Sequence, residues 1–189
     1  MTHSPWSQEA FDEALFFAAR AHAAELQTFP GTDLPYLCHV VLVAQEVMAA
    51  LAVEDHEDGD LALRCALLHD TIEDTAVTHG ELAAAFGGAV ADGVDALSKR
   101  EAASEGAEGA ERKQRMMADS LRRIGGQPRA VWMVKLADRV SNLRAPPHYW
   151  SPDKRARYRE EARQILDALG EASPYLAARL EARIASYPG

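Results

Sequence analysis

The stretch ALLHDTIEDT, residues 66–75, places four ionisable side chains directly after an apolar run. Residues four apart share one face of a helix, so we expect Glu73 to lie over His69 and Asp74 over Asp70. Histidine nitrogens and carboxylate oxygens suit a divalent cation such as manganese, iron or zinc. The alternative is a solvated acidic helix end, which the helix dipole makes slightly unfavourable. The pattern favours a functional site over a merely charged surface.

The same helical period extends outward from this stretch along almost the whole chain. Paired glycines and prolines separate the periodic segments, as at Gly125-Gly126 and Pro146-Pro147. The run AVWMVKLA, residues 130–137, would suit a buried strand, but its period continues through Leu143 and indicates a helix. We therefore predict an all-α fold. Its first helix contains Phe11 to His22, and its second has Val41, Ala44, Val47, Met48 and Leu51 on one face. The others cover about 60–74, 78–86, 89–97, a charged segment before Gly125, 130–144, 153–169 and 174–186.

The chain has 189 residues, of which 48% are hydrophobic and 26% are charged, which is typical of one globular domain. We expect a single domain over residues 1–189, with a metal-site core over about 35–145 and C-terminal helices over about 151–187. These amphipathic helices can pack on that core or against a second chain, so a homodimer stays open. Residues 101–111 (EAASEGAEGAE) are small and acidic and predict an exposed loop, which would be free to order around a substrate.

The chain carries 20 Lys and Arg residues against 29 Asp and Glu residues, a net charge of −9. This excess argues against a nucleic-acid-binding protein, because such binding comes mainly from cations on phosphate. A small anionic substrate is compatible with it where the site supplies positive charge. The most apolar segment, residues 40–53, contains Gln45 and Glu46 and is too short to span a bilayer. With two cysteines and no signal-peptide pattern, we expect a cytoplasmic protein that binds no membrane.

Further candidates for a metal site lie outside the opening stretch. The segment VKLADRVSNLR, residues 134–144, places Asp138 in an apolar helix, where a carboxylate is costly unless it is paired or binds a metal. Asn142 follows one turn later on the same face. Arg139 can pair with a carboxylate elsewhere in the fold. His39 follows Pro-Tyr-Leu-Cys and, taken alone, suits a core or capping residue.

Taken together, these segments resemble the HD-domain metal-dependent phosphohydrolases, and among them the hydrolase domain of RelA/SpoT proteins and the free-standing small alarmone hydrolases. The resemblance lies in PYLCH at 35–39, ALLHDTIEDT at 66–75, Phe86-Gly87 and KLADRVSNLR at 135–144, in the family's order. It implies an HD-type helical bundle, with Glu73 and Asp74 as the acidic pair around an attacking water. It also implies that one divalent metal ion, usually Mn²⁺, is bound by His39, His69, Asp70 and Asp138.

The resemblance further implies a set of substrate contacts. Asn142 matches a residue on the nucleotide side of the family's pocket, and Lys99 stands in Ser98-Lys99 where the family has Thr-Lys. Lys154 and Tyr158, one turn apart, match a basic residue and a tyrosine of the nucleotide pocket, and Arg144 would help to balance phosphate charge. The family's Arg-Lys pair before its Pro-Tyr motif has no counterpart, because residues 27–35 (QTFPGTDLP) contain no cation.

The implied reaction is metal-dependent hydrolysis of the 3′-pyrophosphate of guanosine tetra- or pentaphosphate, which yields GDP or GTP and pyrophosphate. Two alternatives stay open. The cation-free segment 27–35 also suits a related enzyme that acts on another nucleotide, such as an adenosine alarmone or a nucleoside monophosphate. The second alternative is a non-catalytic nucleotide-binding regulatory module, which the complete set of expected ligands and the Glu73–Asp74 pair disfavour.

Overall fold

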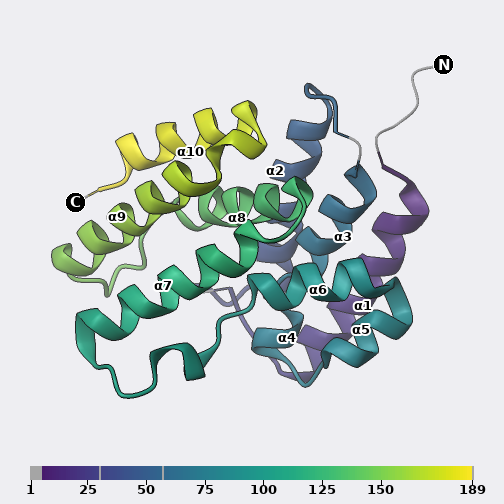
Figure 1. The fold of residues 1–189 in the computed structure, drawn as a ribbon, viewed down its shortest axis with the longest axis horizontal. Helices are drawn as coiled ribbons and strands as arrows, with labels where there is room; N and C mark the ends of the chain where they lie inside the picture. The colour runs from purple at the N-terminus through teal and green to yellow at the C-terminus, as the bar shows by residue number, and fades with distance from the viewer. Residues whose placement is uncertain (1–5, 30, 57, 189) are drawn as a thin grey trace.

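The computed structural model describes residues 6–29, 31–56 and 58–188, which form helices joined by short loops (Figure 1). Residues 1–5, 57 and 189 of the expected domain lie outside the described residues, as does Pro30 of the cation-free segment. The all-α prediction is confirmed for the described part of the chain, where the only β pairing is an isolated bridge between Thr28 and Pro35. The elements are α1 (Gln8–Ala24), α2 (Leu37–Leu51), α3 (Gly59–Leu68), α4 (Thr71–Asp74), α5 (His79–Phe86), α6 (Gly88–Leu97), the 3₁₀ helix η1 (Glu101–Ser104), α7 (Gly109–Gly125), α8 (Arg129–Asn142), α9 (Pro152–Leu169), the 3₁₀ helix η2 (Gly170–Ala172) and α10 (Pro174–Ser186).

Helix α3 lies at the centre of the core and packs against α1, α2, α6 and α8. Its apolar side chains, Leu63, Leu67 and Leu68 among them, are fully buried. Helix α6 approaches α3 and α8 closely at Gly93, where a Cβ atom would lie 2.9 Å from both Cys65 Sγ and Val131 Cγ2. This packing brings α2, the end of α3 and α8 together, and these three elements carry the expected metal ligands.

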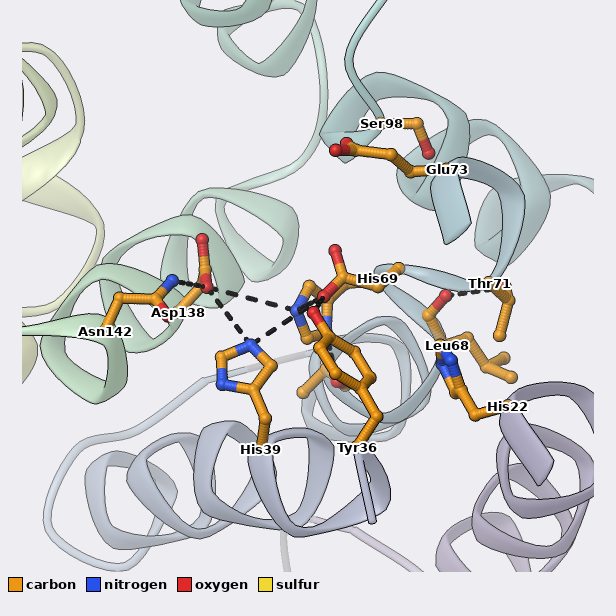
Figure 2. Close-up of polar contacts among 12 residues, drawn as sticks. His22, Tyr36, His39, Leu68, His69, Thr71, Glu73, Ser98, Asp138 and Asn142 are labelled. Atoms are coloured by element: carbon orange, nitrogen blue, oxygen red, sulfur yellow. Dashed lines mark hydrogen bonds and ion pairs between the residues drawn. The ribbon is translucent and has the colours of Figure 1, made fainter. Parts of the chain in front are cut away.

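The helix expected over residues 60–74 is interrupted at His69 and Asp70, which is a correction to the sequence prediction. Side chains form hydrogen bonds with backbone carbonyl groups that would accept main-chain hydrogen bonds in a continuous helix. The His69 Nδ1 lies 2.8 Å from the Ala66 carbonyl oxygen, and the Thr71 hydroxyl donates to the Leu68 carbonyl at 2.7 Å. Such bonds compete with the backbone ladder and end the helix. At this break His69 faces His39 of α2 and Asp138 of α8 (Figure 2). The neighbouring Asp70 Oδ2 lies 3.7 Å from His39 Nε2.

The inner face of α2 also differs from the prediction. Of the predicted apolar face, Ala44, Val47 and Leu51 are buried, but Val41 is 39% exposed. Val40 and Val43, which were not assigned to that face, are fully buried. The helix is rotated relative to the predicted apolar stripe because two polar residues, His39 and Glu46, face inward. Each has charged partners there, which offset the cost of burying a polar group.

The segment 101–111 is more ordered than the exposed loop that its composition predicts. Its first residues form η1, and the side chains of Ser104 and Ala107 are buried. Helix α7 then begins at Gly109, and Arg112 in its first turn pairs with Glu101. Apart from these two residues the segment is mostly exposed, as its composition predicts.

The C-terminal helices α9 and α10 lie beside α7 and α8, at the left of Figure 1. Two buried or half-buried carboxylates hold α10 to the rest of the fold. Glu46 of α2 pairs with Arg179 of α10 at 3.0 and 2.5 Å, and Glu54 accepts hydrogen bonds from the Ser173 hydroxyl and the Tyr175 backbone N–H, each at 2.6 Å. Within the described residues, no helix combines the length and the apolarity that crossing a bilayer requires.

Candidate metal centre and adjoining basic cavity

Side chains from three separate parts of the fold converge on one pocket (Figure 2). His39 comes from the first turn of α2, and His69 and Asp70 come from the break between α3 and α4. Their nearest ligand-type atoms lie within 4.8 Å of one another, and the group is able to hold a metal ion. Asp138 of α8 faces the same two histidines, with its Oδ1 3.5 Å from His39 Nε2 and 4.0 Å from His69 Nε2.

The surroundings of His69 fit a bound cation. Its Nδ1 is engaged by the Ala66 carbonyl, so the Nε2 atom faces the pocket. Asp70 Oδ2 lies 2.9 Å from this Nε2, yet the pair lacks hydrogen-bond geometry and the nitrogen is buried. Burial opposes a positive charge on His69, but the charges of Asp70 and Asp138 outweigh it and raise the pKa of His69 to about 9. Positive charge is therefore favoured at this point, and a divalent cation would supply it in place of the proton.

Asp138 is oriented by its own helix. Lys135 Nζ lies 3.2 Å from Asp138 Oδ2, and the Asn142 amide donates to Asp138 Oδ1. Burial opposes ionisation of Asp138, but the charge of Lys135, together with His39 and His69, holds the pKa of this carboxyl well below its usual range. Hydrogen bonds to a ligating carboxylate orient it and tune its basicity.

Glu73 and Asp74 follow on α4 but have different environments. The Glu73 carboxylate accepts the backbone N–H of Lys99 at 2.8 Å and also pairs with Lys99 Nζ. Figure 2 shows Glu73 beside Ser98, away from the two histidines. Asp74 makes no side-chain hydrogen bond or ion pair within the described residues, and burial, with the charges of Asp70 and Glu73, raises its pKa. Asp74 is therefore the carboxylate with free acceptor oxygens.

The four expected ligands and both acidic residues line a cavity of about 380 Å³. A second cavity, of about 450 Å³, shares Lys99 and Lys135 with the first, so the two adjoin. The chain contains four lysines, and all four line this second cavity. We call it the basic cavity; its charged and aromatic lining consists of Lys99, Lys113, Lys135, Arg139, Lys154, Arg157, Glu161, Trp150 and Tyr158.

The structure places most of the expected substrate residues at these two cavities. Asn142 lines the first, Lys154 and Tyr158 line the basic cavity, and Lys99 lines both. Arg144 lines neither, because its guanidinium faces Glu46 with Nη2 3.6 Å from Oε1. Its position therefore gives no support to the expected contact with substrate.

Several lining residues were missed by sequence reasoning. Lys135 lies three residues before Asp138, a helical spacing that would have placed both on one face. Arg139 was expected to pair with a carboxylate, and its Nη1 does lie 3.7 Å from Glu161 Oε2, but the guanidinium also covers the Tyr158 ring at 4.2 Å. No function was expected for Tyr36 beyond its place in the PYLCH motif. In the structure its hydroxyl donates to Asp70 Oδ2.

The described residues of the cation-free segment, 27–29 and 31–35, are joined by backbone hydrogen bonds into a short hairpin against the metal pocket. Phe29 N–H donates to the Leu34 carbonyl at 2.8 Å, and Tyr36 N–H donates to the Gln27 carbonyl at 3.1 Å. Gln27 and Thr28 line the first cavity, and the Phe29 ring stacks on His39 with ring centroids 5.6 Å apart. The wall here is neutral, whereas the opposite side of the site is strongly basic.

The HD domain family model matches residues 14–174 of the chain. Among curated proteins, the GTP pyrophosphokinase of Myxococcus xanthus is 35% identical over 159 residues, which are 81% of this chain and 19% of that protein. The guanosine-3′,5′-bis(diphosphate) 3′-pyrophosphohydrolase of Haemophilus influenzae is 37% identical over 140 residues, 72% of this chain and 19% of that protein. The chain thus spans about a fifth of the length of these two relatives.

A shorter relative matches over most of both chains. The guanosine-3′,5′-bis(diphosphate) 3′-pyrophosphohydrolase MESH1 of Danio rerio is 33% identical over 162 residues, 83% of this chain and 82% of that protein. Among solved structures, a metazoan ortholog of SpoT that hydrolyses ppGpp superimposes with a TM-score of 0.76 at 25% identity, covering 95% of this chain and 96% of the other. A protein of Listeria monocytogenes EGD-e shares the fold at a TM-score of 0.55 and 22% identity, covering 81% of this chain and 99% of the other.

Proposed function

This chain belongs to the HD domain family, and on that basis we propose that it hydrolyses the 3′-pyrophosphate of guanosine tetra- or pentaphosphate. The relatives named for this reaction include one that matches the chain over most of its length. The reaction consumes one water, breaks the bond between O3′ and its phosphorus, and releases pyrophosphate and GDP or GTP. We further propose that the ion is Mn²⁺ and that Asp138 is the fourth ligand beside His39, His69 and Asp70.

The observation that carries this proposal is the adjoining pair of cavities. A nucleotide with diphosphates on both O3′ and O5′ needs two places for phosphate. The metal pocket would take the 3′-diphosphate, and the basic cavity, with all four lysines of the chain, would take the 5′-diphosphate. Lys99 and Lys135 lie between them and serve both. Although the protein has a net charge of −9, these clustered cations would provide the local positive charge that a phosphate-rich substrate needs.

The chain's own residues divide the remaining work. A bound divalent ion would act as a Lewis acid on a phosphoryl oxygen and acidify a nearby water. Asp74, with free oxygens and a raised pKa, would accept the proton of the attacking water. Glu73 would hold Lys99 against the phosphates through its two contacts with that residue. Asn142 and Lys135 would keep Asp138 turned toward the histidines.

A second candidate is an HD-type phosphohydrolase that acts on another nucleotide, such as an adenosine alarmone or a nucleoside monophosphate. The hairpin wall at Gln27, Thr28 and Phe29 favours it, because these described residues offer no cation that could contact a guanine or its ribose. A nucleoside monophosphate would leave the basic cavity unfilled, so the adenosine alarmone is the stronger of these alternatives.

A nucleotide panel tests the proposal. The purified chain, stripped with EDTA and reloaded with Mn²⁺, is incubated with guanosine tetraphosphate, guanosine pentaphosphate, adenosine 3′,5′-bis(diphosphate), GMP and AMP, and products are separated by anion exchange. We expect pyrophosphate from the guanosine compounds, and none from the His69→Ala variant. Faster release from the adenosine compound would establish the second candidate. Nucleotide binding without any product, by a metal-loaded protein, would favour a regulatory module.

A further inference from the structure

Tyr36 connects the metal pocket to the N-terminal part of the fold. It precedes α2 directly, three residues before His39. Its hydroxyl donates to Asp70 Oδ2, and this same oxygen lies 2.9 Å from His69 Nε2 and 3.7 Å from His39 Nε2. The tyrosine thus contacts the carboxylate atom around which the three-residue group is gathered.

The ring of Tyr36 is fixed from both sides. The His39 ring lies on one side at 5.3 Å between centroids, and the His22 ring lies on the other at 5.0 Å (Figure 2). His22, in the last turn of α1, is only 3% exposed, and its Nδ1 is 2.9 Å from Gln27 Oε1. The Tyr36 backbone N–H donates to the Gln27 carbonyl at 3.1 Å. Gln27 and His22 therefore hold the backbone and the ring of Tyr36, while its hydroxyl reaches Asp70.

We propose that Tyr36 is a positioning residue of the metal centre: its hydroxyl fixes the orientation of the Asp70 carboxylate, and the His22–Gln27 pair fixes Tyr36. Asp70 sits at a helix break, and its side chain makes no capping hydrogen bond there that would restrict its rotation. A donor on Oδ2 removes that freedom before an ion binds, so less entropy is lost on binding. The proposal rests on the proposed function only in requiring that a divalent ion occupies the pocket.

The matched control is another buried tyrosine. Tyr187 is 3% exposed, and its hydroxyl has no hydrogen-bond partner within the described residues. Its neighbour in ring contact is Tyr158, at 6.3 Å, rather than a metal ligand. Tyr187→Phe therefore removes the same atom as Tyr36→Phe without removing a donor to Asp70.

The experiment measures metal binding without turnover. Mn²⁺ is titrated calorimetrically into the EDTA-stripped wild-type, Tyr36→Phe and Tyr187→Phe proteins, each comprising residues 1–189, and the absorption of the Co²⁺ forms reports ligand geometry. We expect Tyr36→Phe to raise the Kd for Mn²⁺ by about 10- to 100-fold, as loss of an outer partner of a metal ligand typically does. Its Co²⁺ spectrum should change, whereas Tyr187→Phe should match the wild type in both. Thermal unfolding of the metal-free proteins checks that the variants fold.

Should Tyr36→Phe fail to fold, His22→Phe provides the second variant, since it keeps an aromatic ring against Tyr36 and removes the bond to Gln27. It should weaken Mn²⁺ binding by less than Tyr36→Phe would, with a broadened Co²⁺ spectrum. Wild-type Mn²⁺ affinity and an unchanged Co²⁺ spectrum in the folded variants would overturn the inference while leaving the metal centre intact. A wild type that binds neither ion would overturn the metal centre itself, and a wild type that binds metal but hydrolyses no nucleotide would overturn the proposed reaction alone.

Discussion

The Glu73 carboxylate accepts the backbone N–H of Lys99 with one oxygen and pairs with Lys99 Nζ through the other. This contact joins α4 to the chain just after α6, and it places Lys99 where the metal pocket meets the basic cavity. It also occupies both oxygens of Glu73 and leaves Asp74 as the acidic residue with free acceptors. The two neighbours should therefore have separable roles.

Replacing each acidic residue by its amide should separate those roles. Asp74→Asn removes the proposed proton acceptor, so kcat should fall by about 10²- to 10⁴-fold, the usual contribution of general base catalysis. Glu73→Gln weakens the hold on Lys99, so KM should rise with a smaller effect on kcat. Steady-state kinetics with Mn²⁺-loaded protein gives both values, and Mn²⁺ titration checks that metal binding survives. A loss of kcat confined to Glu73→Gln would reverse the assignment.

Lysine labelling should report occupancy of the basic cavity directly, since all four lysines of the chain line it. We expect bound guanosine tetraphosphate to slow acetylation of Lys99, Lys135 and Lys154 by N-hydroxysuccinimide acetate, measured by peptide mass spectrometry. The Asp74→Asn variant prevents turnover during labelling. Guanosine, which has no phosphate, is the matched control and should protect none of them. Equal labelling rates with and without a saturating nucleotide would argue that its phosphates lie elsewhere.

Metal binding should raise thermal stability, because the pocket is assembled only in the folded state. At Mn²⁺ concentrations about 100 times the Kd, binding adds about 2.7 kcal/mol to the free energy of unfolding. The unfolding temperature of the EDTA-stripped wild type should therefore increase with Mn²⁺. His69→Ala should show no such increase, because it removes a ligand at the centre of the group. A similar increase in both proteins would place the stabilising ion at another site.

The acid sensitivity of the fold should depend on Glu54. Burial raises the pKa of this carboxyl, but hydrogen bonds from Ser173, Tyr175 and His56 outweigh it and lower the pKa below its ordinary value. Its contribution is therefore present above the unfolded pKa of about 4.3 and is lost as pH falls through the lower folded value. Glu54→Gln should reduce the free energy of unfolding by about 1–3 kcal/mol at pH 7, and the difference from wild type should shrink in acid.

Glu13→Gln is the matched control for that measurement. Glu13 is largely exposed and lies 3.4 Å from Arg64, so its replacement should cost at most about 1 kcal/mol. Urea unfolding of the three proteins at pH 7 and at about pH 3, which is well below the unfolded pKa of a glutamate, provides the comparison. If Glu54→Gln lowered the free energy of unfolding by the same amount in acid as at pH 7, the contribution of Glu54 would come from packing and not from its charge.

Periodicity and chain-breaking residues were enough to predict the helical fold. The helix expected over about 78–86 is present as α5, and Gly87, at φ +88°, separates it from α6. The structure adds a capping box between Thr78 and Glu81 at the start of α5. The strand-like run before Asp138 is helical in α8 because its period continues. These features are determined by residues close together in the chain, so they can be predicted from local sequence.

The break at His69 and the rotation of α2 depend instead on contacts between distant segments. Glu46 is buried because Arg179, far along the chain, pairs with it, and no local pattern encodes that partner. Likewise, the contact between the Tyr36 hydroxyl and Asp70 requires α2 and the end of α3 to be packed together first. Sequence motifs therefore predicted most of the residues that line the metal pocket. Residues that contact the expected metal ligands, such as Tyr36, could be identified only from the folded structure.

The most direct test of the proposed reaction is to identify by ³¹P NMR what the Mn²⁺-loaded chain releases from guanosine tetraphosphate. We expect pyrophosphate and GDP in equal amounts, formed by the wild type and absent with His69→Ala or with excess EDTA. Stepwise release of orthophosphate, or an unchanged nucleotide in the presence of metal-loaded wild type, would contradict it.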